Sequence, residues 1–147
     1  MVSMYGLKIV NGDLAVQGDG NITELTGHER LEQELSCWIL EPLGTDRMYS
    51  NFGSTLDGYV GSPIIDEYLI DIRAEVTRVV NNYIAYQRQQ IQEARNSSTA
   101  SFINAWRPDD IISSLDDIQI ESMADTVKVV VKLTTMTGDE ISVEQVV

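Results

Sequence analysis

The chain holds few of the side chains on which nucleophilic or metal-dependent chemistry depends. It has one histidine, His28, and one cysteine, Cys37. A Ser-His-Asp triad on a G-x-S-x-G elbow and a P-loop of the G-x-x-x-x-G-K-[ST] type are both missing from the sequence. A structural zinc site needs more histidines or cysteines than these two. We therefore predict no catalytic, cofactor-binding or metal-binding residues, with His28 at a helix start or surface and Cys37 as a small buried hydrophobe.

Pairs of carboxylates are the remaining route to catalysis. Glycoside hydrolysis needs two carboxyl groups about 5–10 Å apart. With 23 acidic residues in the chain, some pairs fall at such distances by chance, and no acid has an obvious apolar neighbour that would raise its pKa. A peptidoglycan-cleaving, lysozyme-like enzyme is thus only an alternative, and the protein is predicted not to be an enzyme. The candidate acids are Glu29, Glu32, Glu34, Glu41 and Asp46.

Charge and length limit the partners. The formal net charge of −13 argues against nucleic acid and against an anionic membrane surface. A basic protein surface remains a candidate partner, although solubility is a sufficient reason for the acids. We find neither an apolar run of about 18 residues nor a secretion signal. The 147 residues are predicted to form one domain, 1–147.

The first 40 residues predict a β hairpin followed by a helix. Apolar runs flank Asn11-Gly12, a pair typical of tight hairpin turns, and a further short strand is expected over 22–25. Thr26 and Glu29 have the spacing of a capping box. The helix is expected to end near Leu40, and its buried stripe comprises Leu31, Leu35, Trp38 and Ile39.

A glycine-rich loop and a long helix follow. Within the loop, Gly53 and Gly58 are expected at positive φ, and a short helical turn is expected over 55–60. The long helix is predicted over 62–95, with Ser62 as N-cap and Pro63 at the first helical position. Its polar last part, 87–95, is expected to project or to contact a partner. The predicted apolar face comprises Ile65, Tyr68, Leu69, Ile72, Val76, Val79, Val80 and Tyr83.

The last third of the chain alternates apolar and polar residues, which predicts an antiparallel meander of about three strands. The fold class is therefore α+β, with a short N-terminal hairpin, two main helices and a C-terminal antiparallel sheet. An open sheet edge could accept a strand from another chain. Periodicity leaves open whether such an edge exists here.

In its order of elements the chain resembles the baseplate wedge family of contractile tails, also called phage baseplate assembly protein W or the lysozyme-like sheath initiator. This family has relatives in type VI secretion baseplates. The resemblance covers nearly the whole chain. It rests on the helix at 32–40, the segment 44–47 and the motif Phe52-Gly53-Ser54-Thr55-Leu56. The family's Glu-Pro-Arg motif is replaced here by Ala105-Trp106-Arg107-Pro108-Asp109.

The resemblance implies a structural role in the virion, within the tail baseplate assembled in the host cytoplasm. The expected partners are other wedge subunits and the tail sheath protein, whose first ring would be templated by strand addition; tail tube or hub proteins are further candidates. A small protein-binding adaptor is the other alternative. The implied wedge contacts are Phe52, Gly53, Ser54, Leu56, Trp106, Arg107 and Pro108. The implied sheath-binding residues are Val127, Val129, Val131, Leu133, Ile141, Val143 and Val147.

Overall fold

Three antiparallel strands near the end of the chain form the main sheet of the computed structural model, which describes residues 6–11, 13–96 and 108–147. The strands are β5 (Ile112–Ser122), β6 (Val127–Thr135) and β7 (Glu140–Val146), in the order β5-β6-β7. The predicted meander is confirmed, and so is the α+β class. Strand β6 is central, so its main chain is hydrogen-bonded on both sides.

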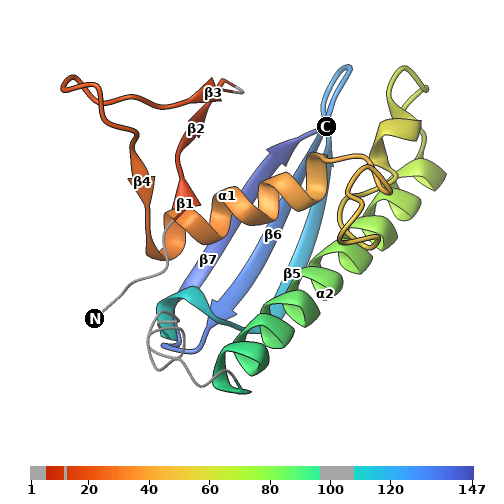
Figure 1. The fold of residues 1–147 in the computed structure, drawn as a ribbon. Coiled ribbons are helices and arrows are strands. Elements are labelled where there is room, and N and C mark those ends of the chain that lie inside the picture. Colours follow the sequence, from red (N-terminus) through yellow and green to blue (C-terminus); the bar gives the residue numbers. More distant parts are fainter. Residues whose placement is uncertain (1–5, 12, 97–107) are drawn as a thin grey trace.

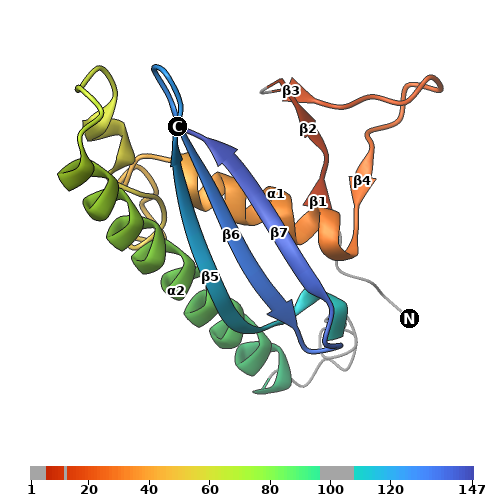
Figure 2. The ribbon, with the colours of Figure 1, turned by 180° about the vertical axis from the view of Figure 1, so that it is seen from behind.

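Two helices, α1 (Gly27–Leu40) and α2 (Asp66–Asn96), cover one face of this sheet (Figure 1). Seen from behind, the other face carries no helix in the described part of the chain (Figure 2). Alternate residues of β6 point into the helix-covered layer, because successive side chains of a strand face opposite sides. Val129, Val131 and Leu133 are consequently fully buried there.

The buried helical stripes agree with the sequence analysis. All four predicted residues of α1 are buried, and on α2 the buried positions run from Ile72 to Tyr83 in steps of three and four. Of the predicted apolar face, Tyr68 and Leu69 are only half-buried, and Ile65, which is 42% exposed, lies before the first helical residue.

The predicted start of the long helix at Ser62 is wrong, since α2 begins at Asp66. Gly61 has a φ of +82°, and Ser62 donates its N–H to the carbonyl of Tyr59 in a turn. The first helical carbonyl is that of Ile65, which accepts from Tyr68 and Leu69. The intervening Ile64 packs against the core, which holds this segment outside the helix.

The capping box of α1 is not formed, although the helix has the expected bounds. Thr26 is the N-cap residue but makes no side-chain capping hydrogen bond. Gly27 follows with a φ of +63°, and its peptide is therefore rotated away from helical geometry. The Asp109 carboxylate lies beside Gly27 at this helix start.

The expectation that the whole 87–95 segment projects is wrong at Gln87. Its side chain is buried and joins α2 to the start of β5. Gln87 Nε2 donates to the Asp110 carbonyl at 2.6 Å, and its Oε1 accepts from the Ile112 N–H at 2.8 Å. One buried amide thereby satisfies two backbone groups where the chain enters the sheet.

The N-terminal residues form a β arm that extends away from the helices and sheet (Figure 1). Strand β1 (Gly6–Leu7) pairs with β4 (Glu24–Leu25), and β2 (Ile9–Val10) pairs with β3 (Asp13–Leu14). The predicted hairpin is confirmed, with Gly12 of its turn outside the described residues. Cross-strand pairing puts four aliphatic side chains on one face of the arm, each 44% to 61% exposed: Ile9, Leu14, Val16 and Ile22.

Candidate functional site

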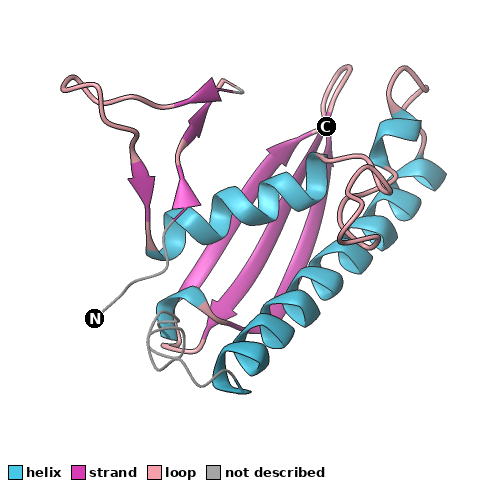
Figure 3. Ribbon diagram, in the orientation of Figure 1, coloured by secondary structure: helices cyan, strands magenta, loops and turns pink. Residues whose placement is uncertain are grey.

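The 41–65 loop lies beside the C-terminal end of α1 and the first half of α2, and it carries the Phe52–Leu56 motif (Figure 3). Its short helical turn is η1 (Leu56–Tyr59), as predicted. Gly53 has a φ of +102°, which confirms the expectation for this glycine, whereas Gly58 is not at positive φ. A Cβ on Gly53 would lie 2.5 Å from the Glu41 carbonyl oxygen. Only glycine therefore fits where this loop crosses the end of α1.

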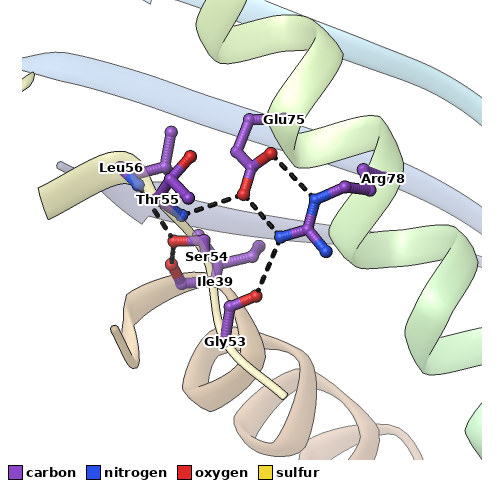
Figure 4. Close-up of polar contacts among 7 residues, drawn as sticks. All are labelled: Ile39, Gly53, Ser54, Thr55, Leu56, Glu75 and Arg78. Atoms are coloured by element: carbon purple, nitrogen blue, oxygen red, sulfur yellow. Dashed lines mark hydrogen bonds and ion pairs between the residues drawn. The ribbon is translucent and has the colours of Figure 1, made fainter. Parts of the chain in front are cut away.

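Ser54 joins the loop to α1 (Figure 4). Its Oγ donates to the Ile39 carbonyl at 2.5 Å and accepts from the Leu56 N–H at 3.4 Å. Its backbone N–H donates to the Glu41 carbonyl at 2.7 Å. Because Ser54 is buried, these bonds satisfy polar groups that water cannot reach.

Glu75 and Arg78 of α2 hold the same loop from the other side (Figure 4). Glu75 Oε1 accepts from the Thr55 N–H at 2.8 Å and from Arg78 Nη2 at 2.5 Å. Arg78 Nη2 also donates to the Gly53 carbonyl at 3.2 Å. The hydrogen bond from Arg78 is the largest cause that lowers the pKa of Glu75, and it raises the pKa of Arg78. The loop is thus bonded to both helices.

Phe52 completes the attachment through aromatic contacts. Its ring meets Trp38 of α1 edge-on, with centroids 4.9 Å apart and planes at 80°. Trp38 also lies 5.4 Å from Tyr86 of α2, which meets Tyr49 of the loop at 5.1 Å. Burial first, and then Tyr49, raises the pKa of Tyr86 to about 12. Phe52, Trp38 and Tyr86 border a groove of about 250 Å³ between the two helices, beside Cys37.

The structure brings the motif residues together but places Pro108 elsewhere. Gly53, Ser54 and Leu56 are buried and Phe52 is half-buried at the C-terminal end of α1. Pro108 is exposed in η2 (Pro108–Asp110), which packs near Gly27 at the opposite end of that helix. Trp106 and Arg107 lie outside the described residues. The buried side chains of the motif therefore position the loop. The exposed residues of the same loop form the surface at the C-terminal end of α1.

The second candidate surface is the outer edge of β7. Val127 and Val147 exchange both backbone hydrogen bonds, at 3.1 and 2.8 Å. Bonded and non-bonded pairs alternate in an antiparallel ladder, so Gln145, Val143 and Ile141 also bond to β6. The backbone groups of the residues between them point away from β6: Glu140, Ser142, Glu144 and Val146. No strand of the described chain pairs with β7 on that side.

This geometry separates two roles within the implied sheath-binding set. Val127, Val129, Val131 and Leu133 lie on β6, which has strands on both sides, so their backbone groups are already bonded. Ile141 and Val143 are buried and bonded to β6. Alternation in the sequence does not single out Ser142, Glu144 and Val146. It shows which face of the sheet each side chain occupies, but not whether the N–H and C=O of that residue point toward β6 or away from it. Both backbone groups of Ser142 and Glu144 and the N–H of Val146 point away from β6, while the Val146 carbonyl accepts from Gln145 Nε2 at 3.1 Å.

Acidic side chains surround this edge. Asp139, Glu140 and Glu144 are exposed. Lys128 Nζ lies 3.3 Å from Glu144, and His28 Nε2 lies 3.7 Å from Asp139. A strand with basic residues on its solvent face would therefore find opposite charges at β7.

Three of the five candidate acids accept hydrogen bonds from neighbouring groups: Glu34, Glu41 and Asp46. Glu34 accepts hydrogen bonds from Tyr83 Oη at 2.7 Å and Arg30 Nε at 2.8 Å. Asp46 accepts from two backbone N–H groups of its own turn. The expectation that Cys37 is buried is wrong, because it lies off the stripe that faces the sheet and α2. Partial burial, then Glu34 and Glu41, raise the pKa of its thiol.

The described residues contain no group of three or more metal-ligating side chains. None of the helices described there is long and apolar enough to cross a membrane. Comparisons of the chain with models of protein families, with curated proteins and with solved structures find no match.

Proposed function

We propose that this protein is a structural subunit of a contractile-tail baseplate wedge, which helps to assemble the inner baseplate and templates the first sheath ring. Strand β7 is the template. Its partners are other wedge subunits and the tail sheath protein, and its location is the baseplate of the tail, assembled in the host cytoplasm.

The free edge of β7 is the observation that carries this proposal. Ser142 and Glu144 offer backbone donors and acceptors to an incoming strand, and Val146 offers its N–H. Strand addition derives its affinity from such main-chain hydrogen bonds. Register would come from alternate side chains. Buried Ile141 and Val143 anchor β7 to the core, so the template is preformed.

The Phe52–Leu56 motif of the 41–65 loop supports the proposed contact with other wedge subunits. Its bonds to Ile39, Glu75 and Arg78 fix one surface where α1 ends beside α2. A surface held by hydrogen bonds to two helices costs little conformational entropy when a neighbouring subunit binds. We assign the contact to the exposed part of the loop, with the buried motif residues as its support.

The test is a Ser142→Pro variant compared with Ser142→Ala. Proline removes the N–H that points away from β6 and places its ring at the edge, where proline is tolerated within a sheet. The alanine control removes the hydroxyl but keeps the N–H. We expect Ser142→Pro to remain folded by circular dichroism but to give tails without sheath, and Ser142→Ala to assemble normally.

Electron cryomicroscopy of assembled tails supplies the second measurement. We expect density for this chain at the baseplate–sheath junction, with a sheath strand paired to β7. Normal sheath on particles that carry a folded Ser142→Pro subunit would refute the template, and absence of the chain from the particle would refute the baseplate assignment itself.

A further inference from the structure

A separate apolar pocket lies where α2 begins beside the ends of two strands. Its volume is about 230 Å³. The loop contributes Tyr59 and Val60, α2 contributes Tyr68 and Leu69, and the sheet contributes Val127 and Val147. We call it the Tyr59 pocket.

The Tyr59 pocket is open at the surface, and contacts within the protein hold its lining residues in place. Val60 is 75% exposed at its rim. The rings of Tyr59 and Tyr68 pack against each other at 5.5 Å between centroids. Val127 is buried and bonded to Val147 through both backbone groups, so the strand side of the pocket is fixed by the sheet.

Its size selects the class of ligand. Sites for drug-sized molecules and cofactors span roughly 300–1,000 Å³, more than this pocket offers. A volume of about 230 Å³ with apolar walls fits a single large side chain, which is how anchor residues bind at protein interfaces.

The electrostatic surroundings restrict the partner further. Asp125 is the only charged side chain among the described residues that line the pocket. The pKa of Tyr59 is raised by partial burial and then by the nearby carboxylates of Asp71 and Glu75. Asp66 and Glu67, exposed in the first turn of α2, add negative charge directly before Tyr68. Anionic ligands are therefore disfavoured, and cationic flanking residues are favoured.

We propose that the Tyr59 pocket binds one leucine-sized or aromatic side chain of a partner protein, presented between lysine or arginine residues. The pocket adjoins the end of β7 through Val147, but its apolar walls do not include the outward backbone groups of Ser142 and Glu144, and it does not depend on the proposed sheath interaction. It gives the protein a second, side-chain-mediated contact in addition to a backbone-mediated one.

The test uses the full-length ¹⁵N-labelled chain and three short probe peptides in an NMR titration. The probe is acetyl-Lys-Leu-Lys-amide; acetyl-Lys-Ala-Lys-amide lacks the anchor, and acetyl-Glu-Leu-Glu-amide reverses the flanking charge. We expect saturable shifts at the amides of Val60, Leu69 and Val127 with the first peptide. The two control peptides should each bind at least about tenfold more weakly, since each lacks one of the two recognised features.

Two charge variants complete the test. Asp125→Lys should weaken the binding of the lysine peptide several-fold, whereas Asp13→Lys, the same change on the distant arm, should leave it unchanged; both positions are exposed, so the fold is preserved. Equal binding of the alanine peptide, equal binding to the Asp125→Lys variant, or shifts confined to other surfaces would overturn the proposal. Binding of the peptide to Ser142→Pro should equal that to the wild type, so this proposal and the β7 template fail separately.

Discussion

Gly53 shows how one residue type can be required by two constraints at once. Its φ of +102° favours glycine, and its missing Cβ leaves room for the Glu41 carbonyl. Ser54, the next residue, then reaches the Ile39 carbonyl with its hydroxyl. At the residue scale, the motif is therefore a device for attaching the 41–65 loop to the helices.

The first prediction compares two glycines of the same loop. Gly53→Ala should lower the free energy of unfolding by at least about 2 kcal/mol, because backbone strain and a clash with the chain of Glu41 add together. Gly58→Ala should be neutral or slightly stabilising, since Gly58 is not at positive φ and its Cβ would meet nothing within 4 Å. Urea denaturation measures both, and equal effects would contradict the assigned role of Gly53.

The second prediction concerns pH. Because the pKa of Glu75 is lowered below its ordinary value of 4.5, its charged form stabilises the folded state. That contribution is complete above about pH 4.5 and is lost as the pH falls through the lowered pKa. Glu75→Gln should cost about 1–2 kcal/mol at pH 6, since Arg78 is partly screened by water, and the cost should shrink toward pH 3.

Urea midpoints of the wild type and Glu75→Gln at both pH values measure this difference. Glu67→Gln is the control, because Glu67 is exposed at the start of α2. A cost of Glu75→Gln that stays constant between pH 6 and pH 3 would rule out the ionic contribution.

At the scale of elements, α2 organises the molecule through contacts in both of its halves. In its first half Glu75 and Arg78 bind the loop, and in its second half Gln87 binds the chain that enters β5. At about 1.5 Å per residue, its 31 residues span roughly 46 Å. The polar segment after Tyr86 thus includes one residue, Gln87, that is buried and has a structural role.

The third prediction follows from that residue. Gln87→Ala should cost about 2–4 kcal/mol, because the Asp110 carbonyl and the Ile112 N–H would lose their partner while buried. Gln89→Ala should change stability by less than about 0.5 kcal/mol, since Gln89 is exposed and bonds to Glu93 at the surface. Thermal or urea unfolding distinguishes the two, and a Gln87→Ala variant as stable as Gln89→Ala would show that the amide is dispensable.

On the scale of the whole molecule, a well-packed layer carries two lightly supported features, the β arm and the β7 edge. The core between helices and sheet contains Leu35, Val76 and Val129, all with no exposed surface. The arm instead leaves Leu14, Val16 and Ile22 largely exposed. Burial is therefore unequal along the chain, and local stability should follow it.

The fourth prediction is a hydrogen-exchange pattern. The amides of Val129 and Val131 should exchange slowest, at rates set by global unfolding, because β6 is bonded on both sides. The amides of Ile9 and Leu14 should exchange orders of magnitude faster, and the outward amides of Ser142 and Glu144 should be fast beside slow Val143. Mass spectrometry or NMR measures these rates, and protection of the arm equal to that of β6 would contradict the pattern.

The sequence by itself determined what depends on neighbours along the chain. Period-two alternation marked the three strands, steps of three and four marked the buried helix stripes, and Asn11 and Gly53 marked tight backbone turns. These features follow from local geometry, which repeats every two or 3.6 residues, and they were sufficient to give the α+β class.

Only the tertiary structure decided what depends on distant neighbours. Which backbone groups of β7 remain free depends on its pairing with β6, and whether Gln87 or Cys37 is buried depends on what packs beside it. Pro108 lies far from Phe52 because the two ends of α1 separate them. A sequence pattern gives the direction of each side chain relative to its own element, whereas contacts between elements settle which faces and edges are left for partners.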